Sequence, residues 1–291
     1  MARKFLLILL LGATLLGGGC ATLDDTQARW IFRPTREAWR GGLDLTQGMH
    51  EHWIEFASQV DAGQAVKLHA LWLPQARSDA PVLLFLHGAR WDLRGSALRM
   101  RRMHELGFAV LGVDYRGFGR SSGDVPSEPR AYEDARQAWG WLAAQQPGKP
   151  RYIFGHSLGG AVAVQLAASV TDEAGLMVEG TFTSVADVLA TYRWGFAGLG
   201  ILITQRFDSI NRIADVGSPL LVVHGTADTV IAPTLGERLY AQARSPKRLE
   251  KVEGGTHHNT NAMGMAQYRR ALGELFGLAS PATPTLTAST R

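Results

Sequence analysis

Apolar and polar positions along the middle of the chain follow two alternating patterns. Continuous apolar runs at 81–86 and 108–113 indicate strands that are buried on both faces of a sheet. Residues 52–60 and 65–73 predict an antiparallel pair of strands around the turn that begins at Asp61. Further short strands are predicted at 152–154, 177–182, 220–224 and 248–252.

Helical patterns separate these strands. The clearest covers 126–146, where Ala131, Ala135, Ala138 and Leu142 form one apolar stripe. Other helices are predicted at 98–106, 158–169, 235–243 and 265–276. Strands that alternate with helices predict an α/β domain over 51–278, with a mostly parallel central sheet flanked by helices.

The first residues have the pattern of an export signal. Arg3 and Lys4 precede an apolar run over 5–16, and the uncharged stretch is shorter than the roughly 20 residues of a membrane-spanning helix. The segment that ends at Cys20 resembles the lipobox of bacterial lipoproteins, which implies a signal peptide over 1–19, acylation of Cys20 and attachment to a bacterial membrane. Gly17 departs from the lipobox, so a secretory peptide that leaves a periplasmic or secreted protein is the alternative. The Ala that follows the cysteine favours the outer membrane.

Three further segments differ from the alternating pattern. Residues 20–50 are interpreted as an N-terminal linker or extension, and the Ala-, Ser-, Thr- and Pro-rich residues 279–291 as a disordered tail. Residues 184–216 are irregular and apolar, and are interpreted as a small lid. Its apolar side chains either pack against the domain or form an acyl pocket or membrane-facing entrance.

Composition excludes several classes of protein. The chain has 291 residues, of which 46% are apolar and 19% charged, so it is too apolar to be disordered. Its net charge is +4 without a long Lys/Arg run, and nothing therefore indicates a nucleic-acid partner. The single cysteine excludes an internal disulfide framework and a cysteine-based zinc site.

The strongest chemical signal lies between a predicted strand and a predicted helix, at Gly155-His156-Ser157-Leu158-Gly159. A serine nucleophile on a sharp strand-to-helix turn requires small neighbours two residues to either side, which Gly155 and Gly159 provide. The start of the helix also brings free N–H groups close to Ser157. Ser157 is therefore the candidate nucleophile.

A serine alcohol needs a histidine base that is oriented by an acid. Asp228 follows the strand at 220–224 and is the candidate acid, with Glu179 and Asp187 as alternatives. The loop after the last strand contains His257 and His258. The spacing from Gly254 favours His257 as the base, and His258 is the alternative. A metal site on the two histidines lacks a third ligand of suitable spacing.

The turn after the strand at 81–86 supplies the candidate oxyanion hole. We expect the backbone N–H groups of Ala89 and Leu158 to face the developing alkoxide. The neighbouring His87 is more typical of a structural than of a catalytic histidine.

Four motifs together resemble the α/β-hydrolase superfamily, namely His87-Gly88, Asp114 to Ser121, Gly155 to Gly159, and Asp228 with His257. The chain is similar to bacterial serine aminopeptidase-like hydrolases and to ABHD-type acyl hydrolases over roughly 50–278. The resemblance implies an α/β-hydrolase fold and a cofactor-free serine hydrolase with a Ser157–His257–Asp228 triad. The expected substrate is a small-molecule carboxylic ester or thioester. The alternatives are a peptidase or amidase of the same fold and a non-catalytic binding protein of the cell envelope.

Overall fold

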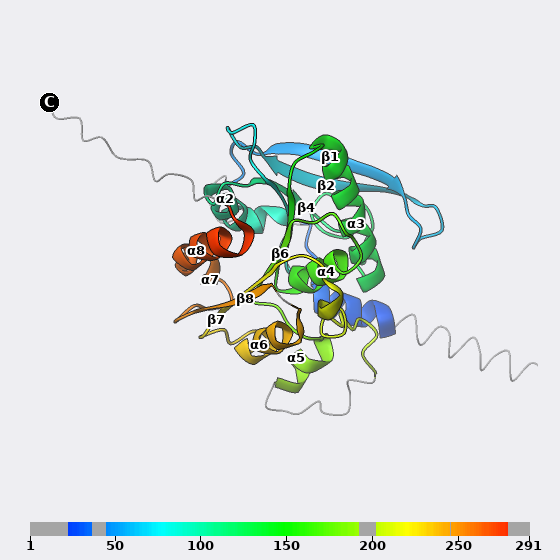
Figure 1. Ribbon diagram of the computed structural model, residues 1–291. Helices are drawn as coiled ribbons and strands as arrows, with labels where there is room; N and C mark the ends of the chain where they lie inside the picture. Colours follow the sequence, from blue (N-terminus) through cyan, green and yellow to red (C-terminus); the bar gives the residue numbers. More distant parts are fainter. Residues whose placement is uncertain (1–22, 37–44, 192–201, 245, 279–291) are drawn as a thin grey trace, which may run out of the picture.

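An eight-stranded sheet runs through the computed structural model, which describes residues 23–36, 45–191, 202–244 and 246–278 (Figure 1). The strand order is β1-β2-β4-β3-β5-β6-β7-β8. β2 pairs antiparallel with β1 and β4, and the other neighbours are parallel. The strands are β1 (His50–Ala57), β2 (Ala65–Leu73), β3 (Val82–Leu86), β4 (Ala109–Val113), β5 (Arg151–His156), β6 (Gly175–Glu179), β7 (Leu220–Gly225) and β8 (Lys247–Val252).

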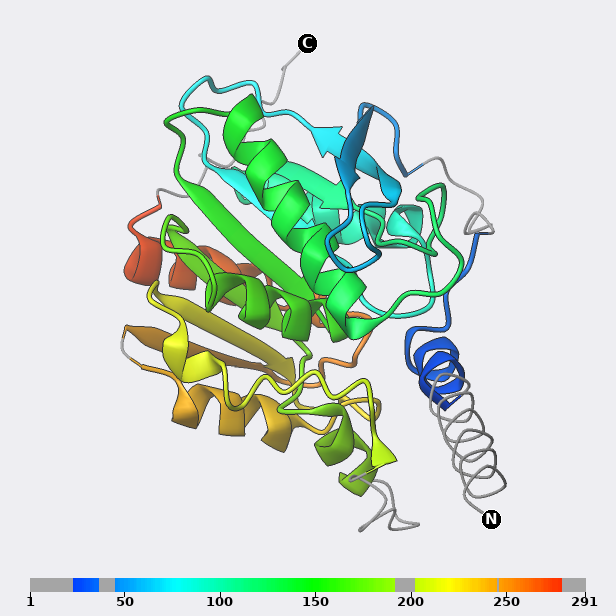
Figure 2. The same ribbon diagram turned by 90° about the vertical axis from the view of Figure 1, so that its right-hand side faces the viewer.

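Each face of the sheet has its own hydrophobic core. All five residues of β3 are buried; Val82, Leu84 and Leu86 belong to one core and Leu83 and Phe85 to the other. Helices on both sides cover these cores (Figures 1 and 2). The first core includes residues of α3 (Glu128–Gln145), α4 (Leu158–Ala167) and α6 (Pro233–Gln242), and the second includes residues of α2 (Ala97–Glu105) and α8 (Met265–Phe276). The continuous apolar runs are thus explained by burial on both faces.

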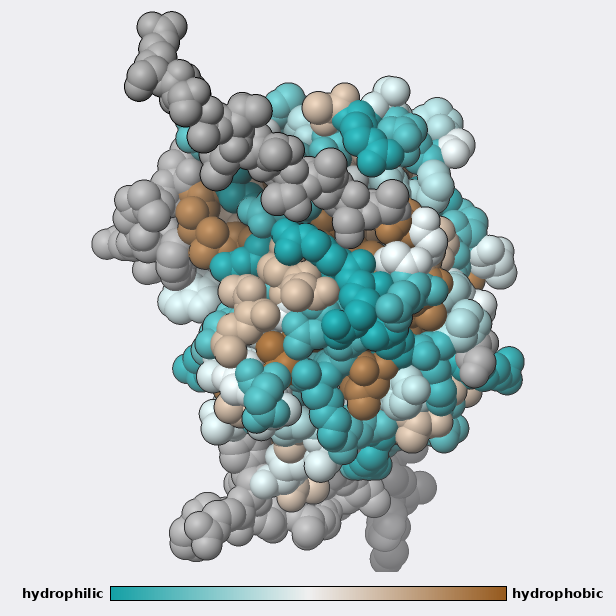
Figure 3. All heavy atoms as spheres, turned by 60° about the vertical axis from the view of Figure 1, so that its left-hand side comes forward, coloured by the Kyte–Doolittle hydropathy of each residue, from teal (hydrophilic) through white to brown (hydrophobic). Residues whose placement is uncertain are grey.

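The helices α2 and α8 present polar side chains to solvent. The face that carries them is mostly hydrophilic, with small separate hydrophobic patches (Figure 3). Each helix therefore buries one apolar stripe against the sheet, as an amphipathic helix on an α/β domain does. Within the described residues, none of the helices combines the length and apolarity needed to cross a bilayer.

Residues 23–32, which the sequence assigned to a linker or extension, form a helix that packs on the domain (Figure 2). Ala28 and Phe32 on this helix are buried in the first core. The Phe32 ring lies 6.3 Å from the Phe118 ring and 5.5 Å from the Phe207 ring, measured between centroids. The helix is therefore an integral part of the domain.

Several element ends differ from those that the sequence predicted. The strand predicted at 177–182 is β6, which ends at Glu179 because Gly180 turns the chain with a φ of 55°. α3 begins at Glu128, after Ser127 caps it by accepting a hydrogen bond from the Arg130 N–H. The short helices η1 (Leu93–Ser96) and α7 (Thr260–Met263) lack the apolar repeat by which longer helices are found.

The described part of the predicted lid contains two short helices, α5 (Val185–Thr191) and η3 (Ile213–Asp215). Val188, Leu189 and Ile203 pack against the first core, whereas Leu202 is exposed. Much of the apolar character of the segment is thus explained by burial. Residues 192–201 of this segment lie outside the described residues, as do the predicted signal peptide, Cys20 and the tail at 279–291.

Candidate active site

Ser157 occupies a strained turn between β5 and α4. Its φ of 55° and ψ of −122° lie in a region that residues with a side chain rarely adopt. A Cβ on Gly155 would lie 2.2 Å from the carbonyl oxygen of Gly159, and one on Gly159 would lie 2.1 Å from that of Leu86. The two glycines therefore allow the turn to press against the end of β3, which holds Ser157 at the carboxyl edge of the sheet.

The structure places His257 between Ser157 and Asp228. His257 Nε2 lies 3.0 Å from Ser157 Oγ, and His257 Nδ1 lies 2.8 Å from Asp228 Oδ2. Because a carboxylate only accepts, Nδ1 carries the proton and Nε2 is left to accept from the serine hydroxyl. His258 is exposed, and its ring centroid lies 5.5 Å from that of His257. His257 thus links Ser157 to Asp228 through hydrogen bonds, and His258 is a neighbour that takes no part in them.

Asp228 is held in its ionised form. Its Oδ1 accepts hydrogen bonds from the N–H groups of Val230 and Ile231 at 2.9 and 2.8 Å. Burial opposes ionisation, but hydrogen bonding from His224 and His257 outweighs burial and holds the pKa of Asp228 below its usual range. The carboxylate is therefore negative at neutral pH and can orient the imidazole.

The two alternative acids point elsewhere. Glu179 accepts hydrogen bonds from Arg99 at 2.9 Å and from the Tyr268 hydroxyl at 2.6 Å. Asp187 accepts from the Thr183 hydroxyl at 2.5 Å. Neither carboxylate has a hydrogen bond to His257, so Asp228 alone among the three candidates orients the imidazole.

The candidate oxyanion donors lie on either side of the turn. Leu158 is the first residue of α4, and Ala89 follows β3 by three positions. Among the described residues, no backbone carbonyl accepts from either N–H, whereas the next N–H along the loop, that of Arg90, donates to the Phe32 carbonyl at 2.8 Å. A Cβ on Gly88 would lie 3.1 Å from Ser157 Cβ, so the loop passes close to the serine. Two uncommitted donors thus lie near it.

His87 has structural contacts. Its Nδ1 donates to the Gly88 carbonyl at 2.7 Å, and its ring packs on those of Tyr115 and Phe118. Burial lowers its pKa, although the negative charge of Asp114 acts in the opposite direction. The buried His87, whose Nε2 lies 3.6 Å from Asp114 Oδ1, therefore supports the shape of the loop.

Two site neighbours received no role in the sequence analysis. His156 Nε2 donates to the His257 carbonyl at 3.1 Å, and Arg99 donates to the same carbonyl at 3.0 Å. His156 lies directly before the serine, so the motif itself could have indicated it. Nothing in the local sequence indicates Arg99, which lies on α2 and is separated from the other site residues by many positions along the chain.

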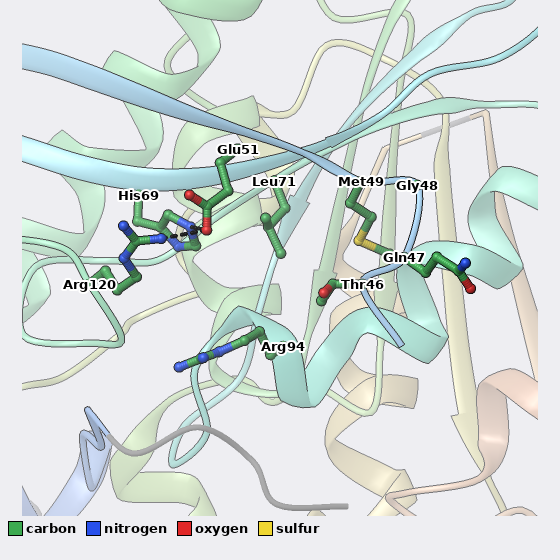
Figure 4. A pocket seen from close by; sticks show the side chains of 9 residues that line it. All are labelled: Thr46, Gln47, Gly48, Met49, Glu51, His69, Leu71, Arg94 and Arg120. Atoms are coloured by element: carbon green, nitrogen blue, oxygen red, sulfur yellow. Dashed lines mark hydrogen bonds and ion pairs between the residues drawn. The ribbon is translucent and has the colours of Figure 1, made fainter. Parts of the chain in front are cut away.

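A separate polar cavity of about 320 Å³ lies beside β1 and β2 (Figure 4). Its charged side chains already have partners: Arg120 pairs with Glu51, and Arg94 with Asp92. His69 lies between Asp114 and Glu51 at 3.0 and 3.4 Å. The cavity is also lined by Thr46, Gln47, Gly48, Met49 and Leu71, and it includes none of Ser157, His257 and Asp228.

Comparisons with known proteins identify the family. A family model described as serine aminopeptidase, S33, matches residues 77–209. An uncharacterized protein of Mycobacterium tuberculosis is 38% identical over 204 residues, which cover 69% of this chain and 71% of the other. The chain belongs to the α/β-hydrolase superfamily.

Two further proteins are similar to this chain. The lysophosphatidylserine lipase ABHD12 of Danio rerio is 32% identical to this α/β-hydrolase over 192 residues, which cover 60% of this chain but only half of the lipase. A solved esterase of Pyrococcus furiosus has a TM-score of 0.65 at 16% identity, with 84% of this chain and 99% of the esterase covered. That structure supports the α/β-hydrolase fold, which the strand order also shows.

Proposed function

We propose that this α/β-hydrolase cleaves carboxylic esters or thioesters through Ser157, His257 and Asp228. The observation that carries the proposal is the continuous hydrogen-bonded line from Asp228 through His257 to Ser157 Oγ. Its terminal atom is an alcohol oxygen beside two uncommitted N–H groups. This arrangement has the parts that acyl transfer requires: nucleophile, base, orienting acid and donors for an oxyanion.

The first half of the reaction forms an acyl-enzyme. Ser157 Oγ attacks the carbonyl carbon of the ester, and its proton moves to His257 Nε2. The negative charge of Asp228 stabilises the imidazolium that results. The carbonyl oxygen becomes an oxyanion, for which the N–H groups of Ala89 and Leu158 are the proposed donors, and the loss of one such donor typically costs about 10²–10³ in rate. His257 then protonates the leaving alcohol or thiol as its bond to the acyl carbon breaks.

The second half repeats these roles with water. His257 Nε2 removes a proton from water, which attacks the acyl carbon, and the second oxyanion occupies the same donors. Its collapse breaks the bond to Ser157 Oγ, which takes the proton back from His257. The carboxylic acid leaves and the free serine is restored. His257 Nε2 therefore serves as base and acid in turn.

Two observations support an acyl ester over a peptide. A curated relative is named a lysophosphatidylserine lipase, and the segment at 184–216 is rich in apolar side chains, with Leu202 exposed. The family model is named for an aminopeptidase, so a peptidase or amidase is the competing candidate. Of the three acids in the described part of that segment, Asp187 and Asp208 already bond to Thr183 and Asn211.

A fluorophosphonate probe tests whether the site is catalytic. Wild-type protein should be labelled and Ser157→Ala should not, while Ser121→Ala serves as a buried-serine control that retains labelling. A p-nitrophenyl ester series of increasing acyl length, run beside aminoacyl p-nitroanilides, then tests the substrate class. No labelling of wild-type protein would support a non-catalytic binding protein of the envelope, and faster anilide than ester turnover would support the peptidase.

We further propose that acylated Cys20 attaches the protein to a bacterial membrane, with the outer membrane favoured. The support is the sequence that precedes it, since a basic start, an apolar run and small residues lead up to the only cysteine. Wild-type protein expressed in a Gram-negative host should incorporate labelled palmitate and fractionate with membranes, and Cys20→Ala should not. Unlabelled wild-type protein in the periplasm would support a secretory peptide instead.

A further inference from the structure

Arg99 connects α2 to the loop that carries the candidate base. Its side chain is only 12% exposed. One terminal nitrogen donates to the carbonyls of His257 and His258 at 3.0 and 3.1 Å, and its Nε donates to Glu179 at 2.9 Å. The guanidinium thus bonds at once to the histidine loop and to the end of β6.

Glu179 fixes the orientation of this guanidinium. Its side chain is 1% exposed, and its second carboxylate oxygen accepts from the Tyr268 hydroxyl of α8 at 2.6 Å. Both oxygens are therefore committed, one to Arg99 and one to Tyr268. Because a buried carboxylate with two donors has little freedom to move, Arg99 is held in one position relative to the sheet.

The backbone at His257 needs such support. It follows Gly254 and Gly255, and Gly254 has a φ of 67°, so the loop leaves β8 through two residues without side chains. The His257 carbonyl accepts from Arg99 on one side and from His156 Nε2 on the other. Two donors from different elements thus fix the peptide group that carries the imidazole.

We propose that Arg99 is a positioning residue for His257, and that Glu179 both orients Arg99 and neutralises its charge next to the imidazole. The inference rests on the proposed function, because it assigns a role toward the same base. A carbonyl fixed from two sides places Nε2 at the 3.0 Å distance from Ser157 Oγ. A displacement of about 1 Å at a reacting group costs on the order of 10²-fold in rate.

The charge of Arg99 reaches the histidines of the site. Burial, and after it the positive charge of Arg99, lowers the pKa of His156 well below its usual range. Burial, His257 and Arg99 likewise lower the pKa of His258. The ion pair of Glu179 with Arg99 offsets this positive charge beside the loop. The charged and titratable groups around this loop are Asp228, His156, His258, Arg99, Glu179, Tyr268 and Arg90, whose charge acts on His258.

Three variants separate position from charge, and their kcat/KM is measured from pH 5 to 9 on one p-nitrophenyl ester. Arg99→Met should lower kcat by about 10²-fold with KM nearly unchanged. The acidic limb of its kcat/KM profile should move to higher pH, because the negative charge of Glu179 is left uncompensated. Glu179→Gln should move the acidic limb to lower pH because Arg99 is left uncompensated. Arg99→Lys keeps the charge but loses the bidentate fork, so it should keep the wild-type limb and recover only part of kcat.

The matched control lies on the same helix. Arg101 also donates to backbone carbonyls, those of Leu45 and Gln47, away from the triad, and Arg101→Met should leave kcat and the acidic limb unchanged. Shifts of the same sign in Arg99→Met and Glu179→Gln, or limbs that do not move, would overturn the proposal. Unfolding curves identify a variant that fails to fold, and Arg99→Lys then supplies the kcat readout.

A failure of the proposed function gives a different result. In that case wild-type protein would lack both ester turnover and probe labelling, whereas a failure of this inference leaves wild type active and its Arg99 variants like Arg101→Met. The NMR titration of the His257 ring gives a readout without turnover. Opposite shifts of that titration in the Arg99→Met and Glu179→Gln variants are expected, and their absence would also overturn the proposal.

Discussion

Two buried clusters of ionisable side chains, one around Arg116 and one around Asp228, differ in whether they end at a partly exposed hydroxyl. Around Arg116, all five guanidinium N–H donors have a protein acceptor: Asp134, Asp61, Ser58, Glu133 and the Arg130 carbonyl. In the line from Asp228 through His257, the last atom is Ser157 Oγ, and the Ser157 side chain is only half-buried. Every guanidinium donor of the Arg116 cluster thus has an acceptor within the protein. The Asp228 cluster ends at a hydroxyl oxygen that a substrate can reach.

The difference teaches that buried charge alone does not mark a site. In both clusters, burial opposes the ionisation of an acid. Burial raises the pKa of Asp134 to about 7 despite the adjacent Arg116. In the other cluster, hydrogen bonds outweigh burial and keep the pKa of Asp228 low. Only the Asp228 cluster combines its charge with strained backbone and free N–H groups. The proposed reactivity therefore depends on the half-buried Ser157 hydroxyl at the end of the line.

The largest expected effect concerns the Ser157 hydroxyl and its proposed base. Ser157→Ala and His257→Ala should each lower kcat by about 10⁶-fold, because nucleophile and base act as one unit. His258→Ala should keep a sizeable share of ester turnover, since no hydrogen bond links its ring to Ser157. If the effects of the two histidine variants are reversed, His258 is the base.

Asp228→Asn should reduce kcat by on the order of 10⁴-fold, because an amide favours the wrong tautomer of His257. Near-normal turnover would point to Glu179 or Asp187 instead. The low pKa of folded Asp228 also makes a stability prediction. Its ionised form stabilises the fold above about pH 4, its ordinary range, and this contribution is lost as the pH falls toward the lower folded pKa. The difference in unfolding free energy between wild type and Asp228→Asn should therefore shrink between pH 7 and pH 3.

A shortened chain tests the contact between the helix at 23–32 and the loop that carries Ala89, a proposed oxyanion donor. A chain that begins at Thr22 should be active, whereas one that begins at Leu45 lacks the Phe32 carbonyl that accepts from Arg90. We expect kcat to fall by about 10-fold to 10²-fold in the shorter chain. This decrease should not exceed the decrease in kcat that follows the loss of one oxyanion donor. Phe32→Leu keeps the carbonyl and should retain most of the turnover. Equal kcat in the two shortened chains would show that the loop holds its shape alone.

A substitution in the Arg116 cluster should lower stability without lowering turnover. Arg116→Met leaves Asp134 and Glu133 buried without their partner and should lower the free energy of unfolding by about 3–5 kcal/mol, as measured in urea. The kcat of the folded fraction should stay at the wild-type value. Lys251→Met breaks an exposed pair with Glu237 and should change the unfolding midpoint little. A large loss of kcat in folded Arg116→Met would contradict the separation of the two clusters.

The α/β-hydrolase fold could be predicted because its signals are local. Continuous apolar runs, small residues around Ser157 and the order of Ser157, Asp228 and His257 are all readable along the chain. The structure brings these three residues into one hydrogen-bonded line. Their roles in turnover stay a prediction, as do the roles of Ala89 and Leu158.

The features that the sequence analysis missed depend on distant contacts. The helix at 23–32 owes its burial to Phe118 and Phe207, and neither partner can be inferred from residues 20–50. The same holds for Arg99, whose partners lie on β6 and on the loop after β8. The motif from Asp114 to Ser121, which carried part of the resemblance, serves the scaffold: Arg116 closes the buried cluster, and Ser121 Oγ bonds to the Asp114 carbonyl at 2.7 Å.

The helix at 23–32 also sets an order of events during synthesis. Gln27 bonds to Leu202 and Thr204, and Gln205 to Asp24, across 175 to 181 residues of sequence. Chains emerge from the ribosome N-terminus first, and contacts between distant residues form slowly. The bonds of this helix to residues 202–205 can therefore form only after β6 and α5 have emerged. Asp228 and His257 emerge later still, so a partly synthesised chain carries Ser157 without a completed site.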